Sequence, residues 1–259
     1  MPELPEVETL FRQLRQVITA ERIAAVRIYD EKLLPFPELR GRRIREVRRV
    51  GKGVEIDLGG AVLRLHLRMS GRLLWRRSGD ILLRHTRFSI AFDKGELLCI
   101  DPRRFATLTL HSGLPEATGR PLNLLAGMAP EEILARAGNR KLPVKALLLD
   151  QRLLPGMGNI YACEVLFETA VSPWRRACDV TPAEWGAIMC AIERILKEAV
   201  ICRGTSISDW RDLFGKPGEY QHRLRVYDRE GKTCLRCPGR IEWRKLSGRG
   251  TYYCPSCQK

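Results

Sequence analysis

Near its C-terminus the sequence reads CLRC at Cys234–Cys237 and CPSC at Cys254–Cys257, two cysteine pairs separated by sixteen residues. Two thiolates spaced in this way can bind one metal ion from a tight turn, and two such turns complete a tetrahedral zinc site. Four thiolates leave no open position, so the ion is expected to be structural and to fold a hairpin too short for a core of its own. We therefore predict one structural Zn²⁺ on Cys234, Cys237, Cys254 and Cys257; iron and a redox-active pair are the alternatives.

Composition favours a soluble chain of cytoplasmic type. With 259 residues, 44% of them hydrophobic and 29% charged, the chain is long for one core, and two or more domains are expected. No apolar run approaches the ~18–20 residues that span a bilayer, and the N-terminal MPELPEVETL fits neither a signal nor a transit peptide. Five further cysteines stand among apolar neighbours and are expected to be small core residues rather than disulfide partners: Cys99, Cys163, Cys178, Cys190 and Cys202.

The net charge points to a polyanionic partner. Lysine and arginine outnumber aspartate and glutamate by 45 to 30, which gives +15 at pH 7. Residues 221–259 carry ten of the basic and three of the acidic side chains, and a second basic cluster spans Arg40–Arg49. Because two separate basic patches suit a polymer better than a small anion, we expect nucleic acid as the partner. A solvated basic surface without a partner is the alternative.

The hydrophobic pattern changes along the chain from helix to strand and back to helix. An amphipathic helix is expected over 2–20, strands from about 23 to 110, and a linker over 111–121. Helices follow, and the last opens with Thr181 and Glu184 as a capping box. The expected helices are 130–138, 143–151, 160–169 and 181–201. The hairpin with the four cysteines, called the finger below, is expected over 221–259.

Two local motifs offer donors or cations to a ligand. The glycine-rich turn Leu154–Tyr161 leads into a helix with Asn159 as the candidate N-cap, and its N–H groups can bind a phosphate; a plain interhelical turn is the alternative. Asp101–Phe105 reads DPRRF and places two cations beside an aromatic ring. An exposed turn with Phe105 in the core is the alternative there, and Met69 would ordinarily be a core methionine.

The N-terminus offers a reactive amine. An initiator methionine before proline is normally removed, which would leave Pro2 with a free secondary amine. An α-amino group has a reference pKa of ~8 against ~10.4 for lysine, so far more of it is unprotonated at neutral pH. Such an amine can attack an aldehyde-like carbon and form an iminium, with Glu3 and Glu6 as adjacent acid–base candidates. An ordinary helix N-terminus is the alternative.

Together these motifs resemble one family over essentially the whole chain. Pro2–Glu8 (PELPEVE), the DPRRF loop, Gly156–Tyr161 (GMGNIY), Val226–Gly231 (VYDREG) and the cysteine pairs occur in the order found in bacterial formamidopyrimidine-DNA glycosylases. The resemblance implies an α+β multidomain fold with an N-terminal helix and antiparallel β-sandwich, a helix-two-turn-helix domain and a zinc-finger β-hairpin. The boundaries expected for these three parts are 1–112, 122–220 and 221–259.

The family's catalytic roles map onto three residues of this sequence. Pro2 resembles the nucleophile that attacks C1′ of the damaged nucleotide, and Glu3 resembles the acid that assists sugar-ring opening and later proton transfers. Lys52, in VGKG, resembles the second catalytic lysine near the phosphates of the lesion. Loss of the base followed by β,δ-elimination from the iminium would give one nucleophile both glycosylase and AP lyase activity.

The resemblance also implies contacts with DNA. Asn159 and Arg249 resemble the pair that holds the phosphates flanking the extruded nucleotide, and Lys145 stands where the family carries a basic residue near the DNA backbone. Because a glycosylase must take the nucleotide out of the duplex, inserted side chains fill the void that it leaves. This wedge is expected from Met69, Arg103 and Phe105.

The pocket for the extruded base is implied at Glu6 and at a loop that contains Thr205 and Ser206. The sequence departs from the family pattern in this loop, where Arg203 replaces the first of two glycines. It departs again beside the wedge and within VYDREG, at three positions where glycine is usual: Arg68, Ala106 and Asp228.

The resemblance therefore implies a bifunctional DNA glycosylase and class I AP lyase that excises 8-oxoguanine and formamidopyrimidines from damaged double-stranded DNA in base excision repair. An endonuclease VIII-like enzyme that prefers oxidised pyrimidines is one alternative, against which the DPRRF wedge with Met69 argues. A non-catalytic binder of damaged DNA is the other, against which Pro2, Glu3 and Lys52 argue. We expect a monomer with one zinc, no small-molecule cofactor and no membrane contact, cytoplasmic and associated with the bacterial nucleoid through DNA.

Overall fold

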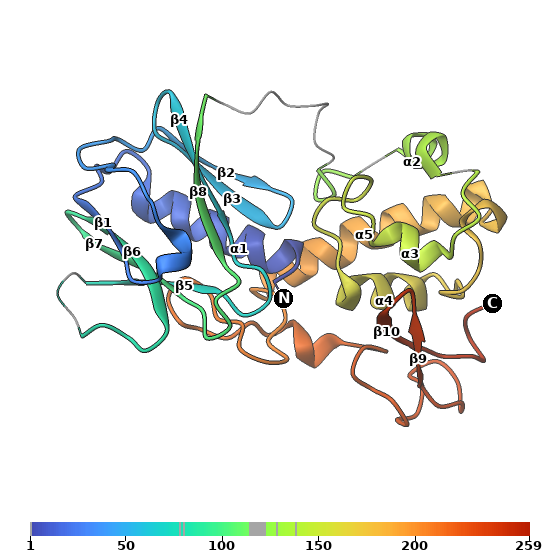
Figure 1. Ribbon diagram of the computed structural model, residues 1–259. Coiled ribbons are helices and arrows are strands. Elements are labelled where there is room, and N and C mark those ends of the chain that lie inside the picture. Colours follow the sequence, from blue (N-terminus) through green and yellow to red (C-terminus); the bar gives the residue numbers. More distant parts are fainter. Residues whose placement is uncertain (1, 78, 80, 114–122, 128, 138) are drawn as a thin grey trace. The chain divides into compact units, whose positions relative to one another are not determined.

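The structure is a computed structural model that describes residues 2–77, 79, 81–113, 123–127, 129–137 and 139–259 (Figure 1). Contacts divide the chain into two compact units, Met1–Gly119 with Cys202–Glu219 and Arg120–Ile201 with Tyr220–Lys259. Part of the expected 111–121 linker, residues 114–121, lies outside the described residues. In the described part of the chain, no helix has the length and apolar character needed to cross a bilayer.

The first unit contains two four-stranded antiparallel sheets, as expected for the sandwich (Figure 1). One sheet has the order β2-β3-β4-β8 and consists of β2 (Glu46–Val50), β3 (Gly53–Asp57), β4 (Ala61–His66) and β8 (Thr107–Ser112). The other has the order β1-β6-β7-β5 and consists of β1 (Ala25–Ile28), β6 (Thr86–Phe92), β7 (Gly95–Ile100) and β5 (Arg72–Arg76). A short 3-10 helix, η1 (Glu31–Leu33), follows β1.

Helix α1 (Leu4–Ile18) closes the core of this unit (Figure 1). Val7, Leu10, Leu14 and Ile18 recur at helical spacing, and each is at most 1% exposed. They join apolar side chains from both sheets in one continuous core. The sequence predicts a slightly longer helix, 2–20; the structure starts it at Leu4 and ends it at Ile18.

The second unit is helical, with a β-hairpin at its C-terminal end (Figure 1). The predicted capping box is confirmed, because the Thr181 N–H donates to Glu184 Oε2 at 2.8 Å and the Glu184 N–H donates to Thr181 Oγ1 at 3.3 Å. The helices of this unit are α2 (Pro130–Ala137), α3 (Val144–Leu148), α4 (Asn159–Glu168), α5 (Pro182–Ile201), η2 (Ala177–Asp179) and η3 (Tyr220–Arg223).

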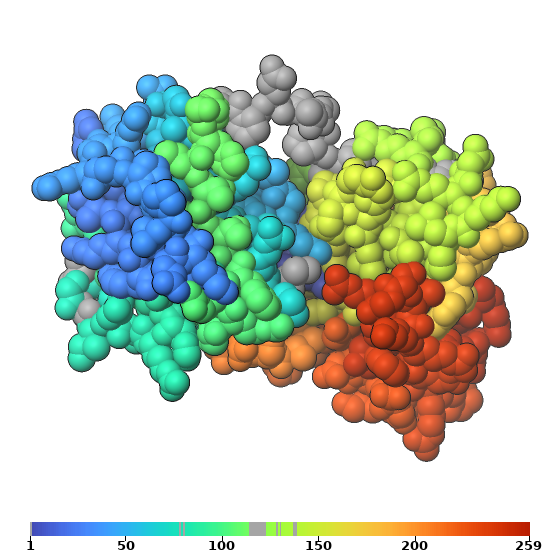
Figure 2. Space-filling view, viewed as in Figure 1, coloured from blue at the N-terminus to red at the C-terminus, as the bar shows by residue number. Residues whose placement is uncertain are grey.

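The hairpin of β9 (Glu242–Leu246) and β10 (Arg249–Tyr253) lies against α4 of the same unit, and Figure 2 shows this finger, in red, next to the helices. A small apolar cluster joins it to α4 through Cys163, Phe167 and Val226. The hairpin is too short for a core of its own, and its apolar side chains are buried instead against α4.

The segment Cys202–Glu219 was expected in the helical domain, but it belongs to the unit of the sandwich. The Leu213 N–H donates to Gln13 Oε1 of α1 at 2.9 Å, and the Trp75 N–H donates to Leu213 O at 2.8 Å. Trp210 and Leu213 are buried in the core of the sandwich. The expected boundary at residue 220 therefore differs from the packing, because this segment buries its apolar side chains against α1 and the sheets.

Three of the positions where the family usually has glycine adopt positive φ in this chain. Arg68 has φ 56°, Arg203 has φ 58° and Asp228 has φ 58°. This left-handed region is the one that glycine enters most readily. At these three positions the backbone thus adopts a conformation that glycine would adopt without strain.

Candidate functional site

Glu6 ties the N-terminal residues to the loop expected to cover the extruded base. Its Oε2 accepts a hydrogen bond from the Glu3 N–H at 2.7 Å, and its Oε1 accepts one from the Thr205 N–H at 2.7 Å. Pro2 is buried, and Glu3, Glu6 and Thr205 are each at most 4% exposed. Gly204 has φ 81°, and a Cβ there would lie 2.5 Å from Glu6 Oε1, so only glycine fits beside this carboxylate.

Ser206, the other pocket residue predicted in this loop, stabilises the loop itself. Its Oγ donates to Trp210 O at 2.7 Å and accepts from the Gly218 N–H at 2.9 Å. The indole N–H of Trp210 in turn donates to Arg203 O at 2.9 Å. Of the two predicted loop residues, Thr205 is hydrogen-bonded to Glu6 through its backbone, whereas Ser206 cross-links the loop.

Lys52 lies in the turn between β2 and β3, where the strand register brings it near His66. Gly53 pairs with His66 across β3 and β4. Burial, together with the positive charges of Arg68 and Lys52, lowers the pKa of His66 to about 4. Sequence reasoning missed His66 as a neighbour of Lys52, although the β3–β4 alternation could have suggested this register.

The three wedge candidates lie on exposed loops of the first unit. Met69 is 50% exposed and Phe105 is 44% exposed, so neither takes the core position that was the alternative for it. The guanidinium carbon of Arg103 lies 4.8 Å from the centroid of the Phe105 ring. Two large apolar side chains and a cation stacked on one of them are thus presented to solvent, which suits insertion into DNA better than a structural role.

In the second unit, the candidate phosphate-binding residues form a hydrogen-bonded cluster. Lys145 Nζ donates to Asn159 Oδ1 at 2.7 Å, to Gly250 O at 3.1 Å and to Thr251 Oγ1 at 2.7 Å. Asn159 Nδ2 donates to Gly250 O at 2.9 Å. Arg249, one residue before Gly250, is exposed at the start of β10. The cluster therefore fixes the first residue of α4 beside the strand that carries Arg249.

One expectation for this cluster needs correction. Asn159 is the first residue of α4 and not its N-cap, which is Gly158; the Asn159 side chain is instead bonded to Lys145 and Gly250. Lys145 is only 1% exposed, and its ammonium is held among protein acceptors; its place near the DNA backbone stays a prediction.

The four predicted metal ligands come together in the finger. The Sγ atoms of Cys234, Cys237, Cys254 and Cys257 all lie within 4.8 Å of one another. The distances Cys234–Cys257 and Cys237–Cys254 are 3.8 and 3.6 Å, too long for a disulfide and close to the ~3.8 Å between sulfurs around an ion with ~2.3 Å Zn–S bonds. The four residues fit one tetrahedrally bound metal ion.

Without a cation, burial and neighbouring thiols oppose the joint ionisation of these cysteines. A hydrogen bond from the Gly239 backbone lowers the pKa of Cys237 to about 7, whereas burial raises the pKa of Cys254 and raises that of Cys257 to about 12. Four adjacent thiolates repel one another, so a divalent cation is the partner that would stabilise all of them together.

Glu164 is a buried residue that sequence reasoning missed. Its carboxylate accepts hydrogen bonds from the N–H groups of Arg225, Val226 and Tyr227 at 2.9, 3.0 and 2.8 Å. Burial raises the pKa of Glu164, and the three N–H groups oppose that rise. The signal in the sequence is a single acid inside the apolar run of α4. Glu164 fixes the segment that leads from η3 into the finger.

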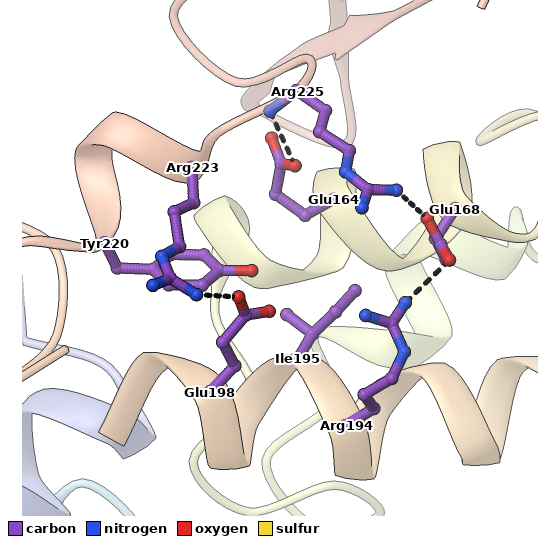
Figure 3. A pocket seen from close by; sticks show the side chains of 8 residues that line it. All are labelled: Glu164, Glu168, Arg194, Ile195, Glu198, Tyr220, Arg223 and Arg225. Carbon is purple, nitrogen blue, oxygen red and sulfur yellow. Dashed lines mark hydrogen bonds and ion pairs between the residues drawn. The ribbon is translucent and has the colours of Figure 1, made fainter. Parts of the chain in front are cut away.

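The same region of the second unit contains a cavity of about 320 Å³ (Figure 3). Its charged side chains neutralise one another: Arg194 donates to Glu168 at 2.6 Å, Arg225 also bonds Glu168, and Arg223 bonds Glu198. None of the predicted site residues lines this cavity. Its lining consists of Glu164, Glu168, Arg194, Ile195, Glu198, Tyr220, Arg223 and Arg225.

A helix-capped β-sandwich, a helical unit and a four-cysteine hairpin define the class to which the protein belongs, the helix-two-turn-helix proteins with a C-terminal finger. Two family models match the chain: the formamidopyrimidine-DNA glycosylase N-terminal domain over residues 1–108 and the helix-two-turn-helix (H2TH) domain of the same family over residues 121–210. Curated relatives cover it completely. The formamidopyrimidine-DNA glycosylases of Chloroflexus aurantiacus and Pelotomaculum thermopropionicum are each 38% identical to it, with 98% and 99% of their own lengths covered.

Solved structures of Lactococcus lactis Fpg are also similar to this chain over its length. One is a mutant in complex with DNA that contains Fapy-dG, and another is a complex with DNA that contains an abasic site. Each has a TM-score of 0.89 and 29% sequence identity to this chain; coverage is 100% of both chains in the first case and 99% in the second. The chain belongs to the formamidopyrimidine-DNA glycosylase family.

Proposed function

We propose that this protein is a DNA glycosylase of base excision repair that removes oxidised purines, 8-oxoguanine and formamidopyrimidines, from double-stranded DNA and then cleaves the strand as an AP lyase. The observation that carries the proposal is the whole-chain match to the formamidopyrimidine-DNA glycosylases, which includes the N-terminal PELPEVE sequence. The Lactococcus lactis relatives were solved with DNA that contains Fapy-dG or an abasic site, so the same class of ligand is proposed here.

In the proposed reaction Pro2 is the nucleophile. Its secondary amine attacks C1′, the bond to the damaged base breaks, and the base leaves with a proton. Glu3 protonates the ring oxygen of the sugar as it opens, and an iminium forms between Pro2 and C1′. The iminium makes the protons at C2′ acidic, so the 3′ phosphate and then the 5′ phosphate leave by β- and δ-elimination. The bonds from Glu6 to the Glu3 and Thr205 N–H groups support this assignment, because they fix Glu3 next to the loop proposed to cover the base.

The remaining roles are proposed on the same basis. Lys52 contacts the lesion phosphates from the β2–β3 turn, and the Asn159 amide and the Arg249 guanidinium bind the flanking phosphates. Lys145 supports Asn159 from inside the protein. Thr205 and Ser206 belong to the loop over the extruded base, and the finger holds one structural Zn²⁺ on its four cysteines. The protein acts as a monomer in the cytoplasm, on the nucleoid, and needs no small-molecule cofactor.

Borohydride trapping on a panel of lesions tests the proposal. Reduction of the iminium should give a covalent adduct on duplexes that contain 8-oxoguanine opposite cytosine, and tryptic mapping should locate it at Pro2. Trapping that is strong on a thymine glycol duplex and weak on an 8-oxoguanine duplex would favour an enzyme for oxidised pyrimidines. Binding to every lesion without any adduct would indicate a non-catalytic binder, and an adduct at Lys52 with Pro2 unmodified would overturn the assigned nucleophile.

A further inference from the structure

One buried carboxylate in the first unit is hydrogen-bonded to both loops that carry the wedge candidates. Asp101 is 1% exposed. Its Oδ1 accepts from Ser70 Oγ at 2.6 Å and from the Arg103 N–H at 3.1 Å. Its Oδ2 accepts from the Phe105 N–H at 2.7 Å and the Ala106 N–H at 2.6 Å. A single side chain thus joins the loop that contains Met69 to the loop that contains Arg103 and Phe105.

The two loops also touch directly. A Cβ on Gly71 would lie 3.0 Å from the Cβ of Ala106 and 2.5 Å from Leu67 O, so no larger residue fits between them. Ala106 is 2% exposed and joins the core of the sandwich. The family pattern has glycine at this position, and the extra methyl group of Ala106 fills the contact with Gly71. Packing and hydrogen bonding therefore act on the same pair of loops.

A carboxylate can join the two loops because all four groups that contact Asp101 are hydrogen-bond donors, and both of its oxygens accept. Burial would raise the pKa of Asp101, but the bonds from Ser70 and from the backbones of Ala106, Phe105 and Arg103 lower it below its usual value. Arg87 Nη1, 4.0 Å from Asp101 Oδ2, adds positive charge behind it. An ionised carboxylate can accept from two backbone N–H groups on one oxygen and from a hydroxyl and a third N–H on the other.

We propose that Asp101 is a positioning residue for base extrusion: it holds loops 66–71 and 101–106 as one rigid body, so that Met69, Arg103 and Phe105 enter the duplex together. The proposal rests on the proposed function, in which these three side chains fill the void left by the extruded nucleotide. If the two loops moved independently, both would lose conformational entropy when their side chains enter the duplex. Because loops that are already joined lose less entropy, insertion costs less free energy. Asp101 itself touches neither the base nor the sugar.

The first test is Asp101→Asn, which keeps the shape and replaces one acceptor oxygen by a donor. We expect kcat/KM for release of 8-oxoguanine from a duplex to fall at least tenfold. Borohydride trapping on a single-stranded oligonucleotide with an abasic site should stay within twofold of wild type, because a single strand has no void to fill. Asp93→Asn, in an exposed turn of the same unit, is the matched control and should change neither reaction.

Ser70→Ala tests the link between the loops with less risk to folding. It removes the bond from Ser70 Oγ to Asp101 Oδ1. A fluorescent 2-aminopurine opposite the lesion should then report slower insertion, and Ser70→Thr should restore the wild-type rate. In the Asp101→Asn background Ser70→Ala should have little further effect, because the two residues act through one bond.

The outcomes separate this proposal from the proposed function. Equal losses on the duplex and on the single strand in Asp101→Asn would overturn the positioning role and indicate general damage to the fold. Wild-type duplex activity in both Asp101→Asn and Ser70→Ala would overturn it as well. A wild-type protein without activity on either substrate would instead contradict the proposed function, and with it the wedge that Asp101 is proposed to position.

Discussion

Lys145 and Asn159 are joined by a hydrogen bond of 2.7 Å between Nζ and Oδ1 that lies inside the second unit. The ammonium group carries three N–H bonds, and Gly250 O and Thr251 Oγ1 accept from the same nitrogen. Lys145 is almost completely buried, and its ammonium lies among these protein acceptors. It fixes the amide of Asn159 and the strand of the finger in one orientation.

Lys145→Met should therefore weaken the fold and DNA binding together. The substitution keeps the length of the side chain but removes the lysine donor from Asn159 Oδ1 and Thr251 Oγ1, whereas Gly250 O still accepts from Asn159 Nδ2. Each buried acceptor left without a donor costs about 1–3 kcal/mol. We expect the free energy of unfolding to fall by roughly 2 kcal/mol or more in urea denaturation. Affinity for a duplex with an abasic-site analogue should fall as well, because Asn159 loses its orientation. Lys141→Met, exposed in the segment before α3, is the control; wild-type affinity in Lys145→Met would contradict the argument.

Removal of the metal should unfold the finger and leave the sandwich intact. Metal analysis should give one zinc per chain, and Cys237→Ser should abolish it because the three remaining thiols no longer complete a tetrahedron. DNA affinity should fall with the metal content, while the thermal transition of the first unit persists. Cys190, which was expected in the core, is exposed on α5, and Cys190→Ser should retain zinc and affinity. Full DNA affinity in zinc-free protein would rule out a structural role.

DNA binding should weaken steeply with salt, since phosphate contacts dominate the affinity of a chain with net charge +15. The logarithm of the association constant should fall linearly with the logarithm of salt concentration. Arg249→Gln should reduce the slope by about 0.9, the share of one phosphate contact. Arg15→Gln, at an exposed position on α1, should leave the slope unchanged. Affinity that is constant between 50 and 200 mM salt, a range over which phosphate-dominated binding changes by orders of magnitude, would contradict the prediction.

Pro2 should lose its function when its amine is blocked or changed. We expect mass spectrometry of active protein to show no Met1, because an amide at Pro2 cannot form an iminium. Pro2→Gly should bind lesion DNA yet lose most borohydride trapping, since a primary amine is the poorer nucleophile here. Glu3→Gln should bind the lesion but not release the base, because it keeps the shape and removes the proton. Full activity from protein that retains Met1 would overturn the mechanism.

His66 should make stability depend on pH in the mildly acidic range. Its pKa is about 4 in the folded protein, below the value of about 6.5 expected when the chain is unfolded. Between these values the unfolded state binds the extra proton, so burial of His66 costs no stability above pH 6.5 and destabilises the folded state increasingly as pH falls toward 4. The melting temperature should drop over this window in wild type and drop less in His66→Gln. His111→Gln, at an exposed position of β8, should resemble wild type.

The elements of regular structure could be predicted because their signals are local. The alternation around Val54 and the spacing of Leu10, Leu14 and Ile18 place strands and a helix where the structure has them. Helix ends were less accurate, and Asn159 shows why. The rule for N-caps considers only the adjacent backbone, whereas Lys145 and Gly250 compete for the same side chain in the folded protein.

The contacts that assemble the candidate site could not be predicted from periodicity. Glu6 and Thr205 are 199 residues apart in sequence, and their hydrogen bond depends on how Cys202–Glu219 packs against α1. Asp101 shows the same limit, since nothing in DPRRF alone indicates that its carboxylate bonds Ser70. The resemblance to the family identified the candidate site residues, whereas the structure shows which residues they are hydrogen-bonded to.

The positive φ angles of Arg68, Arg203 and Asp228 have an energetic consequence. A residue with a Cβ in this region carries strain of roughly 1–2 kcal/mol that glycine avoids. Strain of this kind persists only where neighbouring contacts determine the backbone, as the bond from Trp210 to Arg203 O does in one loop. The strain at these three positions lowers the stability of the fold, and the smaller conformational entropy of an unfolded chain that carries a side chain there offsets part of that loss.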